Sequence, residues 1–392
     1  MNKTYKKQLV ASAISVTLIG LSQGALATNG DQLFGVTAIQ RSMAGAVVAA
    51  PPDSATVMTN PAGLAELGIK EVRFDLGFGV LNPTREVNSS ESDSNYYLIP
   101  AGAVAFNVDD KLYLGMGMGG LSGMGVDFSD VAPAAGNQAF VTTKQFYKIA
   151  PGFGYKVSDK LSVGASLNID YQSLAMYNGL VGAAGLSLPQ NQVYGYGLTA
   201  GLIYHVNDKV QIGASWVSKQ NMGEFKWNTN SGAYRMTMDG PQQFVLGAAF
   251  KPTPGLLIEA DIKRIQFSDV LGSVPLIHAA GTPGPTSLDF GWDDQTVYMI
   301  GVQKEIDPKT TLRFGFNYGK SPIGPEDVKS NIGSLAVTEK HFTLGLTRQI
   351  SQKVSGTLSY VRAFHNEVTS TDGTTKIELE QNVANVQLSY AF

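Results

Sequence analysis

The feature that most constrains this chain is a period-two alternation of apolar and polar residues that recurs along most of its length. Between residues 161 and 171, every second residue is Leu, Val, Ala, Ile or Tyr, and the residues between them are Ser, Gly, Asn or Asp. The same alternation occurs in residues 210–216, 312–318 and 384–392. Alternation at period two is typical of β-strands with one apolar face. The sequence therefore predicts an all-β fold.

The composition excludes several functional classes. Only 16% of the residues are charged, whereas soluble domains usually have about 25%. The net charge of −3 and the lack of a basic tract argue against nucleic-acid binding. The chain has no Cys, which excludes disulfide scaffolds, iron–sulfur clusters, zinc ribbons and thiol catalysis. After the N-terminus, no stretch approaches the ~18 consecutive apolar residues of a membrane-spanning helix.

The first residues have the pattern of an export signal. Lys3, Lys6 and Lys7 precede an apolar run from Leu9 to Leu21, and Ala25-Leu26-Ala27 provides the small-residue pattern of signal-peptidase cleavage. We therefore predict a signal peptide over residues 1–27. The protein is expected to be exported and to meet a membrane, if at all, through strands rather than helices.

Short turns divide the rest of the chain at regular intervals. Six of them combine Asp, Asn, Gly, Pro or Ser, usually with a following Lys, as in Val157-Ser158-Asp159-Lys160. These residue types form tight connections between antiparallel strands. The predicted strands are 71–81, 95–108, 111–121, 142–157, 160–175, 192–206, 209–222, 233–250, 255–268, 292–306, 309–320, 335–350, 353–366 and 375–392.

These strands could form either a soluble β-sandwich or a transmembrane barrel. They are much longer than the usual five or six residues, and short turns alternate with long loops. The polar face consists mainly of small residues, and aromatic residues gather near the ends of the apolar face. This combination indicates a closed, 14-stranded antiparallel transmembrane β-barrel over residues 70–392. The terminal aromatic Phe392 resembles the signal that outer-membrane barrels present to the barrel assembly machinery.

Residues 28–69 do not fit the strand pattern. They carry only four charged residues, Asp31, Arg41, Asp53 and Glu66, and are otherwise small or apolar. A segment this short cannot form a core of its own, and wide barrels are not filled by the side chains of their own strands. We therefore predict that residues 28–69, called the hatch below, plug the lumen.

One hatch segment carries a resemblance to a known family. Asp53 to Ala65 reads Asp-Ser-Ala-Thr-Val-Met-Thr-Asn-Pro-Ala-Gly-Leu-Ala. It resembles the motif of the long-chain fatty-acid transporter family of Gram-negative outer membranes, which includes uptake channels for toluene and other aromatic hydrocarbons. The resemblance covers the whole chain in architecture but is specific in sequence only around Asn60-Pro61-Ala62. The candidate hatch-motif residues are Asp53, Asn60, Pro61, Ala62 and Gly63.

The resemblance implies a mechanism. Apolar outer loops would capture a hydrophobic substrate and pass it to a pocket at the hatch. A movement of the hatch would then open a sideways route through a kinked third strand, so that the substrate reaches the membrane directly. The location implied is the outer membrane of a Gram-negative cell.

Two regions of the chain could supply these parts. The segment from Met176 to Leu188 has no charge, and an exposed apolar loop generally marks a binding site; it could also fold inward and pack on itself. The candidate capture residues in it are Met176, Tyr177, Leu180, Val181, Leu186 and Leu188. The loop around residues 271–277 is also apolar.

The third strand is rich in glycine, and its candidate lateral-gate residues are Gly115, Gly117, Gly119 and Gly120. Glycine within a strand marks a bulge or a close approach of backbone. The glycines could therefore form a wall opening or simply make room for the hatch. Their spacing also matches a dinucleotide-binding motif, but no helix can follow, so we reject that interpretation.

Charged residues on the inward faces are few. Glu259, Asp261 and Lys263 alternate on one predicted strand, and Arg313 faces the same way on another. Charges that face lipid are costly, so we expect salt bridges in the lumen; Lys263 or Arg313 could instead contact a substrate carboxylate. The four His residues are scattered, so we expect no metal site, no cofactor and no catalytic Ser–His pair.

The sequence thus favours a passive outer-membrane channel for hydrophobic small molecules such as long-chain fatty acids or hydrocarbons, and not an enzyme. A general diffusion porin and an outer-membrane lipid hydrolase are alternatives, and an adhesin or structural barrel is a third. The expected partners are a hydrophobic ligand, outer-membrane lipid and the barrel assembly machinery through Phe392. We expect a monomer that does not bind nucleic acid.

Overall fold

The computed structural model describes residues 29–129, 140–179, 185–230, 232–282 and 284–392. The predicted signal peptide lies outside these residues. No helix in the described ranges is long and apolar enough to span a membrane.

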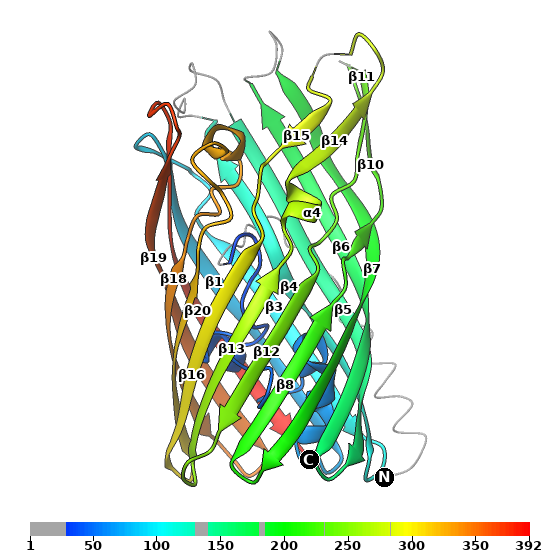
Figure 1. Ribbon diagram of the computed structural model, residues 1–392, viewed down its shortest axis with the longest axis vertical. Helices are drawn as coiled ribbons and strands as arrows, with labels where there is room; N and C mark the ends of the chain where they lie inside the picture. Colours follow the sequence, from blue (N-terminus) through cyan, green and yellow to red (C-terminus); the bar gives the residue numbers. More distant parts are fainter. Residues whose placement is uncertain (1–28, 130–139, 180–184, 231, 283) are drawn as a thin grey trace.

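Fourteen long antiparallel strands form a closed barrel (Figure 1). Each strand pairs with the next, and β1 closes the ring by pairing with both β20 and β3. The prediction of a 14-stranded barrel is confirmed. The barrel strands are β1 (Val72–Val87), β3 (Tyr97–Asn107), β4 (Leu112–Asp127), β5 (Phe140–Ser158), β6 (Leu161–Asn178), β7 (Leu186–Asn207), β8 (Val210–Val217), β12 (Gln243–Phe250), β13 (Leu256–Ile265), β16 (Gln295–Asp307), β17 (Thr310–Gly319), β18 (Lys340–Gln349), β19 (Val354–Thr369) and β20 (Lys376–Ala391).

The two ends of the barrel differ. Short turns close the end at which the C-terminus lies, and long connections extend the other, which we call the outer end (Figure 1). At the outer end, a separate four-stranded sheet consists of β10 (Phe225–Thr229), β11 (Gly232–Met236), β14 (Ser273–His278) and β15 (Ser287–Asp289). The remaining short elements of this half are β2 (Ser90–Glu91), β9 (Asn221–Met222), α4 (Ser268–Leu271) and η2 (Val328–Asn331).

Two predicted strands are wrong in their extent. Residues 233–250 form β11 and β12, which belong to different sheets, and residues 209–222 form β8 and the short β9. The interruption includes Gly240-Pro241, where proline lacks the N–H that a central strand needs. The backbone between β8 and β12 therefore leaves the wall, and the excursion supplies β10 and β11 of the outer sheet.

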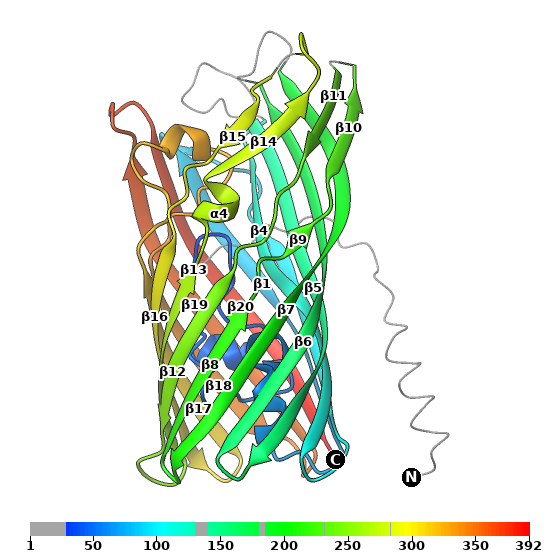
Figure 2. The ribbon, with the colours of Figure 1, turned by 45° about the vertical axis from the view of Figure 1, so that its right-hand side comes forward.

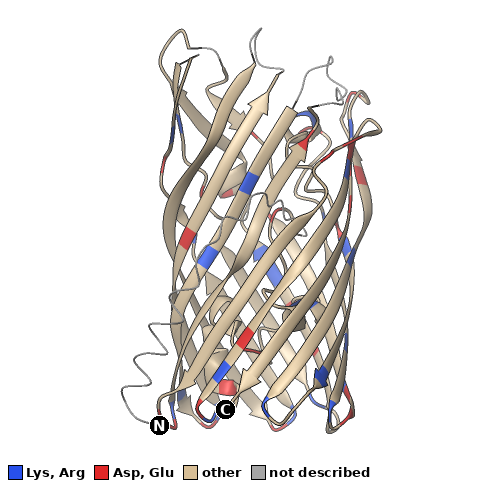
Figure 3. Cartoon of the chain, turned by 180° about the vertical axis from the view of Figure 1, so that it is seen from behind, with Lys and Arg blue, Asp and Glu red and all other residues tan. Residues whose placement is uncertain are grey.

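The outer surface of the wall is apolar. Outward side chains on many strands are largely exposed, for example Leu76 at 68% and Leu246 at 59%. Most strand residues between the two ends of the barrel are uncharged (Figure 3). An apolar band around a closed antiparallel barrel is the arrangement that lipid requires.

The described part of the hatch lies inside the lumen, with its helices in the half nearer the short turns and its first residues extending toward α4 (Figure 2). It contains α2 (Ala38–Ser42), α3 (Thr56–Thr59) and η1 (Pro61–Glu66). The helix α2 packs against β18, β19 and β20, and η1 packs against β5, β6 and β7. Most hatch side chains are buried, so the hatch fills the space that a barrel of this width cannot fill with its own side chains.

The lipid-facing band makes a testable prediction. Leu344→Arg, near the middle of β18, is expected to destabilise the folded barrel in membranes by about 2–4 kcal/mol, because it places a charge in the hydrocarbon layer. Urea titrations of the protein in lipid vesicles measure the effect. Val206→Arg, beside a short turn, is the matched control and should cost much less; an equal cost at both positions would contradict the assigned membrane band.

Candidate functional site

The hatch is folded around a buried carboxylate. Asp53 accepts hydrogen bonds from the Thr37 hydroxyl and from Gln40 Nε2, the latter at 2.9 Å. Thr37 also caps the N-terminus of α2. Burial, with Asp75 of the wall nearby, raises the pKa of Asp53 to about 6. Asp53 thus ties α2 to the segment that leads into α3.

The Asn-Pro-Ala sequence joins the hatch to the wall. The Asn60 side chain accepts a hydrogen bond from the Ala62 N–H at 3.2 Å and so caps η1, and Pro61 occupies the first helical position, where no N–H is needed. Asn60 Nδ2 donates to the Val48 carbonyl at 2.7 Å and to the Leu202 carbonyl of β7 at 3.2 Å. One side chain therefore caps a helix, bridges two hatch segments and holds the wall.

Close packing explains the following glycine. A Cβ at Gly63 would overlap Pro51 and Thr56, so no larger residue fits between the two parts of the hatch. The structure thus brings all five hatch-motif residues into one buried unit.

Two wall carboxylates hold the hatch backbone. Asp261 Oδ2 accepts hydrogen bonds from the N–H groups of Val47 and Val48 at 2.9 and 3.0 Å. Glu259 Oε1 accepts from Ala49 and Ala50 at 2.6 and 3.1 Å. This differs from the expected salt bridges, because the hatch runs past β13 in an irregular conformation whose amides lack partners of their own.

The main cavity lies between the hatch and the wall strands β4, β5, β8, β12, β13 and β16, and has a volume of about 80 Å³. Apolar residues from both sides line it, among them Phe34 of the hatch and Val217, Val245 and Met299 of the wall. The charged residues at its surface are Lys148, Asp261 and Lys263.

A smaller cavity of about 30 Å³ adjoins the main cavity and shares Gln32, Leu121 and Lys148 with it. Of the two predicted carboxylate contacts, only Lys263 lines the main cavity. Arg313 donates to Gln303 at 2.7 Å and to Thr347 at 2.6 Å near the short-turn end of the barrel.

The described residues of the predicted capture segment are mostly strand rather than loop. β6 continues to Asn178 and β7 begins at Leu186, so that Met176 pairs with Leu188. Tyr177 is 38% exposed, whereas Leu186 and Leu188 are buried. The expectation of an exposed apolar loop is therefore wrong for these two leucines, because the alternation of the strands continues and turns them inward. Leu180 and Val181 lie outside the described residues.

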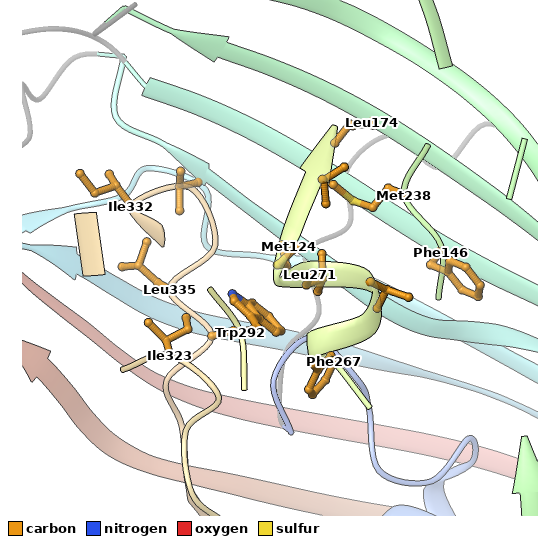
Figure 4. Packing of buried hydrophobic residues seen from close by; sticks show 14 of the residues in the cluster. Met124, Phe146, Leu174, Met238, Phe267, Leu271, Trp292, Ile323, Ile332 and Leu335 are labelled. Carbon is orange, nitrogen blue, oxygen red and sulfur yellow. The ribbon is translucent and has the colours of Figure 1, made fainter. Parts of the chain in front are cut away.

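The two leucines belong to a large apolar cluster inside the outer half of the barrel, which we call the outer apolar cluster. Figure 4 shows Phe267, Leu271 and Trp292 at its centre, with Ile332 and Leu335 on a neighbouring segment. About half of its members come from the connections after β8, β13 and β17, and most of the others are inward-facing residues of the barrel strands. The sequence signal for it was the apolar stretch around residues 271–277, but the contribution of residues 323–337 was missed.

Three glycines of β4 lie against the hatch. A Cβ at Gly115 would contact Leu64, one at Gly117 would contact Met58, and one at Gly119 would lie 3.1 Å from Val36. They therefore provide room for the hatch, which was one of the two interpretations of the glycine pattern.

The wall changes where this glycine row ends. Pairing between β3 and β4 stops at Ala101–Gly119, although β4 continues to Asp127. A register shift follows between Gly120 and Ser122. At this point the hatch replaces β3 as the hydrogen-bonding partner of β4: the Leu33 N–H donates to the Leu121 carbonyl at 2.9 Å.

A buried ion pair that the sequence did not reveal fixes the hatch at this point. Lys144 Nζ lies 2.6 Å from Asp31 Oδ2, and the exposed fractions of the two side chains are 5% and 0%. The Ser122 hydroxyl donates to the same carboxylate at 2.7 Å. We call Asp31, Ser122 and Lys144 the latch.

Comparisons with known proteins agree with this architecture. Residues 24–391 match the family described as outer membrane protein transport protein (OMPP1/FadL/TodX). No curated protein is significantly similar in sequence.

Among solved structures, the Pseudomonas putida toluene transporter TodX is 21% identical, with a TM-score of 0.75, over 93% of this chain and 100% of its own. The Ralstonia pickettii toluene transporter TbuX is 21% identical, with a TM-score of 0.71, over 92% and 99%. A Pseudomonas aeruginosa FadL homologue is 13% identical, with a TM-score of 0.75, over 93% and 100%. These likenesses establish a common fold.

The carboxylates of β13 make a second prediction. Glu259→Ala removes the acceptor for two buried amides, each of which costs about 1–3 kcal/mol when unsatisfied. Hydrogen exchange of the amides of residues 49 and 50 should therefore become at least tenfold faster, and Asp261→Ala should do the same for residues 47 and 48. Glu305→Ala, at the exposed end of β16, is the control. Wild-type protection in both variants would show that these carboxylates do not hold the hatch.

Proposed function

Because this chain belongs to the outer membrane protein transport family (OMPP1/FadL/TodX), we propose that it is a passive uptake channel for monoaromatic hydrocarbons or long-chain fatty acids. It is an outer-membrane transport protein of a Gram-negative cell. The concentration gradient of the substrate is sufficient to drive such uptake, and the protein needs no catalytic residue or cofactor for it.

The observation that carries this proposal is the position of the main cavity. It is lined largely by apolar side chains and lies between a wall and a hatch that are held together by identifiable hydrogen bonds. Small-molecule sites are typically apolar and contain a few well-placed polar groups. A shift of the hatch would enlarge this cavity without breaking any strand pairing of the barrel.

The route into the cavity starts at the outer apolar cluster. Met176 and Tyr177 lie at the outer end of β6, and Leu186 and Leu188 line the interior beside Trp227 and Tyr234. We assign these residues to capture of the substrate. An apolar molecule that enters here would separate apolar side chains of the cluster and pack against them in place of their neighbours.

The route out passes between β3 and β4. There the wall lacks strand pairing above Ala101–Gly119, and Asp31 to Leu33 of the hatch occupy the backbone groups of β4 instead. Withdrawal of this hatch segment would leave a sideways opening next to Gly120. The substrate then enters the membrane without passing the short-turn end of the barrel.

Lys148 and Lys263 bear on the choice of substrate. Both line the main cavity, and Asp261 beside them already accepts two hydrogen bonds from the hatch. The two ammonium groups suit a substrate with an apolar body and a carboxylate end. Lys263 is thus assigned to the carboxylate contact, whereas Arg313 is engaged by neutral partners elsewhere.

The rival functions lack comparable support. In a general diffusion porin, the lumen would be an open aqueous channel, whereas here the hatch fills it. A lipid hydrolase would need a His hydrogen-bonded to a nucleophile, but His205 pairs with Glu66 and His365 pairs with Glu378.

We also propose partners for the assembly of the barrel and for its outer wall. Phe392 packs edge-on against Tyr390 at 4.5 Å, at the end of a strand that is paired on both edges. The barrel assembly machinery is the proposed partner of this strand, and lipid is the partner of the outer wall. A closed barrel with both edges paired is expected to function as a monomer.

Uptake measurements test the cavity. Val245→Trp fills the main cavity and is expected to lower toluene and oleate uptake into proteoliposomes at least tenfold. Leu246→Trp is the matched control, because the neighbouring side chain faces lipid and is 59% exposed. Undiminished uptake by Val245→Trp would refute the cavity as the substrate site, and passage of hydrophilic sugars through the wild type would favour a porin.

The lysine assignment has its own test. Lys263→Met should lower oleate uptake at least tenfold, because a charge-assisted contact contributes about 1.5–3 kcal/mol, and should leave toluene uptake unchanged. Lys304→Met, at the exposed end of β16, is the control. Equal losses for both substrates would show that Lys263 supports the fold rather than the carboxylate.

A further inference from the structure

The connection between β17 and β18 crosses the lumen. Residues 320–339, which we call the outer cap, bury Ile323, Val328, Ile332 and Leu335 in the outer apolar cluster. At the far side, the Thr142 hydroxyl of β5 donates to the Gly333 carbonyl at 2.6 Å. In the order of the strands around the ring, β5 stands opposite β17. The outer cap therefore spans the barrel interior rather than extending away from it.

The side chain of Asn331 anchors the outer cap to its surroundings. Asn331 is fully buried, and its Oδ1 accepts a hydrogen bond from Trp292 Nε1 at 2.6 Å. Its Nδ2 donates to the Phe290 carbonyl at 2.6 Å and to the Asp327 carbonyl at 2.9 Å. Asn331 thus joins the outer cap to the connection that carries Trp292.

Trp292 transmits this contact toward the hatch. Its ring meets Phe267 edge-on with centroids 5.0 Å apart, and both residues are buried at the centre of Figure 4. Gly30 of the hatch lies directly against the pair, since a Cβ there would be 2.6 Å from the Phe267 ring and 3.0 Å from Trp292. Gly30 has a φ of +59°, which favours glycine. The aromatic pair is therefore the seat of the hatch N-terminus.

The residue after Gly30 is the latch carboxylate Asp31. Asp31 holds Lys144 and Ser122 beside the end of the β3–β4 pairing. A continuous line of contacts thus runs from the outer cap through Trp292, Phe267 and Gly30 to the latch.

We propose that the outer cap and the latch form one coupled device, in which displacement of the outer cap releases the exit. This inference rests on the proposed uptake function. A hydrophobic molecule that enters under the outer cap would compete with Gly30 for the aromatic seat, because Gly30 packs directly against the Phe267 and Trp292 rings. Loss of the seat displaces Asp31 from Lys144 and Ser122, and Leu33 then separates from Leu121. While the outer cap is closed, the exit stays shut.

Hydrogen exchange tests the coupling without a transport assay. In Asn331→Ala, the amides of residues 31–33 should exchange at least tenfold faster, whereas the amides of residues 47–50, held by Glu259 and Asp261, should be unchanged. Coupling between sites is reciprocal, so Asp31→Asn should accelerate exchange of residues 331–334. Asn88→Ala, at an exposed turn, is the control. Acceleration confined to the mutated site in both variants would overturn the proposal.

A cross-link provides a second test that does not depend on the stability of Asn331→Ala. The chain has no Cys, so a Thr142→Cys/Gly333→Cys pair would give the protein a single disulfide that locks the outer cap onto β5. Oxidation should slow exchange at residues 31–33 and lower toluene uptake at least tenfold, and reduction should restore both. Equal hydrogen exchange at residues 31–33 in the oxidised and the reduced protein would overturn the coupling. An absence of uptake by the wild type would refute the proposed function and leave the exchange result to be judged separately.

Discussion

Closure of the barrel is the constraint on which the rest of the structure depends. Backbone N–H and C=O groups that face lipid have no water to bond, so a strand in the wall must be paired along both edges. β1 completes the ring by pairing with β20 from Arg73 to Val87 and with β3 from Val72 to Leu81. Closure with fourteen strands leaves a lumen too wide for inward side chains to fill. The remaining structure is the filling of that lumen.

Contact with the hatch explains which residue types occupy the inward faces of the strands. The hatch consists of short helices and irregular segments, which leave backbone amides without partners of their own. Glu259 and Asp261 supply acceptors for four of them, and Asn60 bridges the hatch to β7. Glycines such as Gly117 let the hatch approach the wall closely. The small polar residues that alternate with the apolar ones are thus a docking surface.

The interruption between β3 and β4 would violate the closure rule if nothing replaced the missing pairing. Asp31 and Leu33 of the hatch bond to β4 just beyond the interruption, and Ser92 and Asp93 bond to Asp127 at its outer end. The wall therefore contains a stretch of β4 whose hydrogen-bonding partner is the hatch rather than a neighbouring strand. The sideways route proposed above would start at this stretch, and the closed state has no unpaired edge there.

The period-two alternation was enough to predict the number of strands, their approximate positions and the closed barrel, because it is a local property of each strand. The same local rule did not anticipate that the chain leaves the wall at Gly240-Pro241. The segment between Met176 and Leu188 was predicted as a loop, although the alternation of β6 and β7 continues into it. The hatch motif was recognised from its resemblance to a known family, and one part of its role is local, because Asn60 caps the helix that begins at Pro61. The partners of Asp31, Glu259 and Asp261 were not recognisable, because they lie far away in the chain.

The sequence by itself therefore determined which face of each strand meets lipid and that a low-charge N-terminal segment must find a place inside. Only the tertiary structure decided what each inward side chain meets across the lumen, including the cavity beside Lys263, the outer cap over Trp292 and the latch at Asp31. The physical reason is that alternation specifies direction, inward or outward, whereas contacts across a barrel depend on register, on strand order and on the path of a hatch without a repeating pattern.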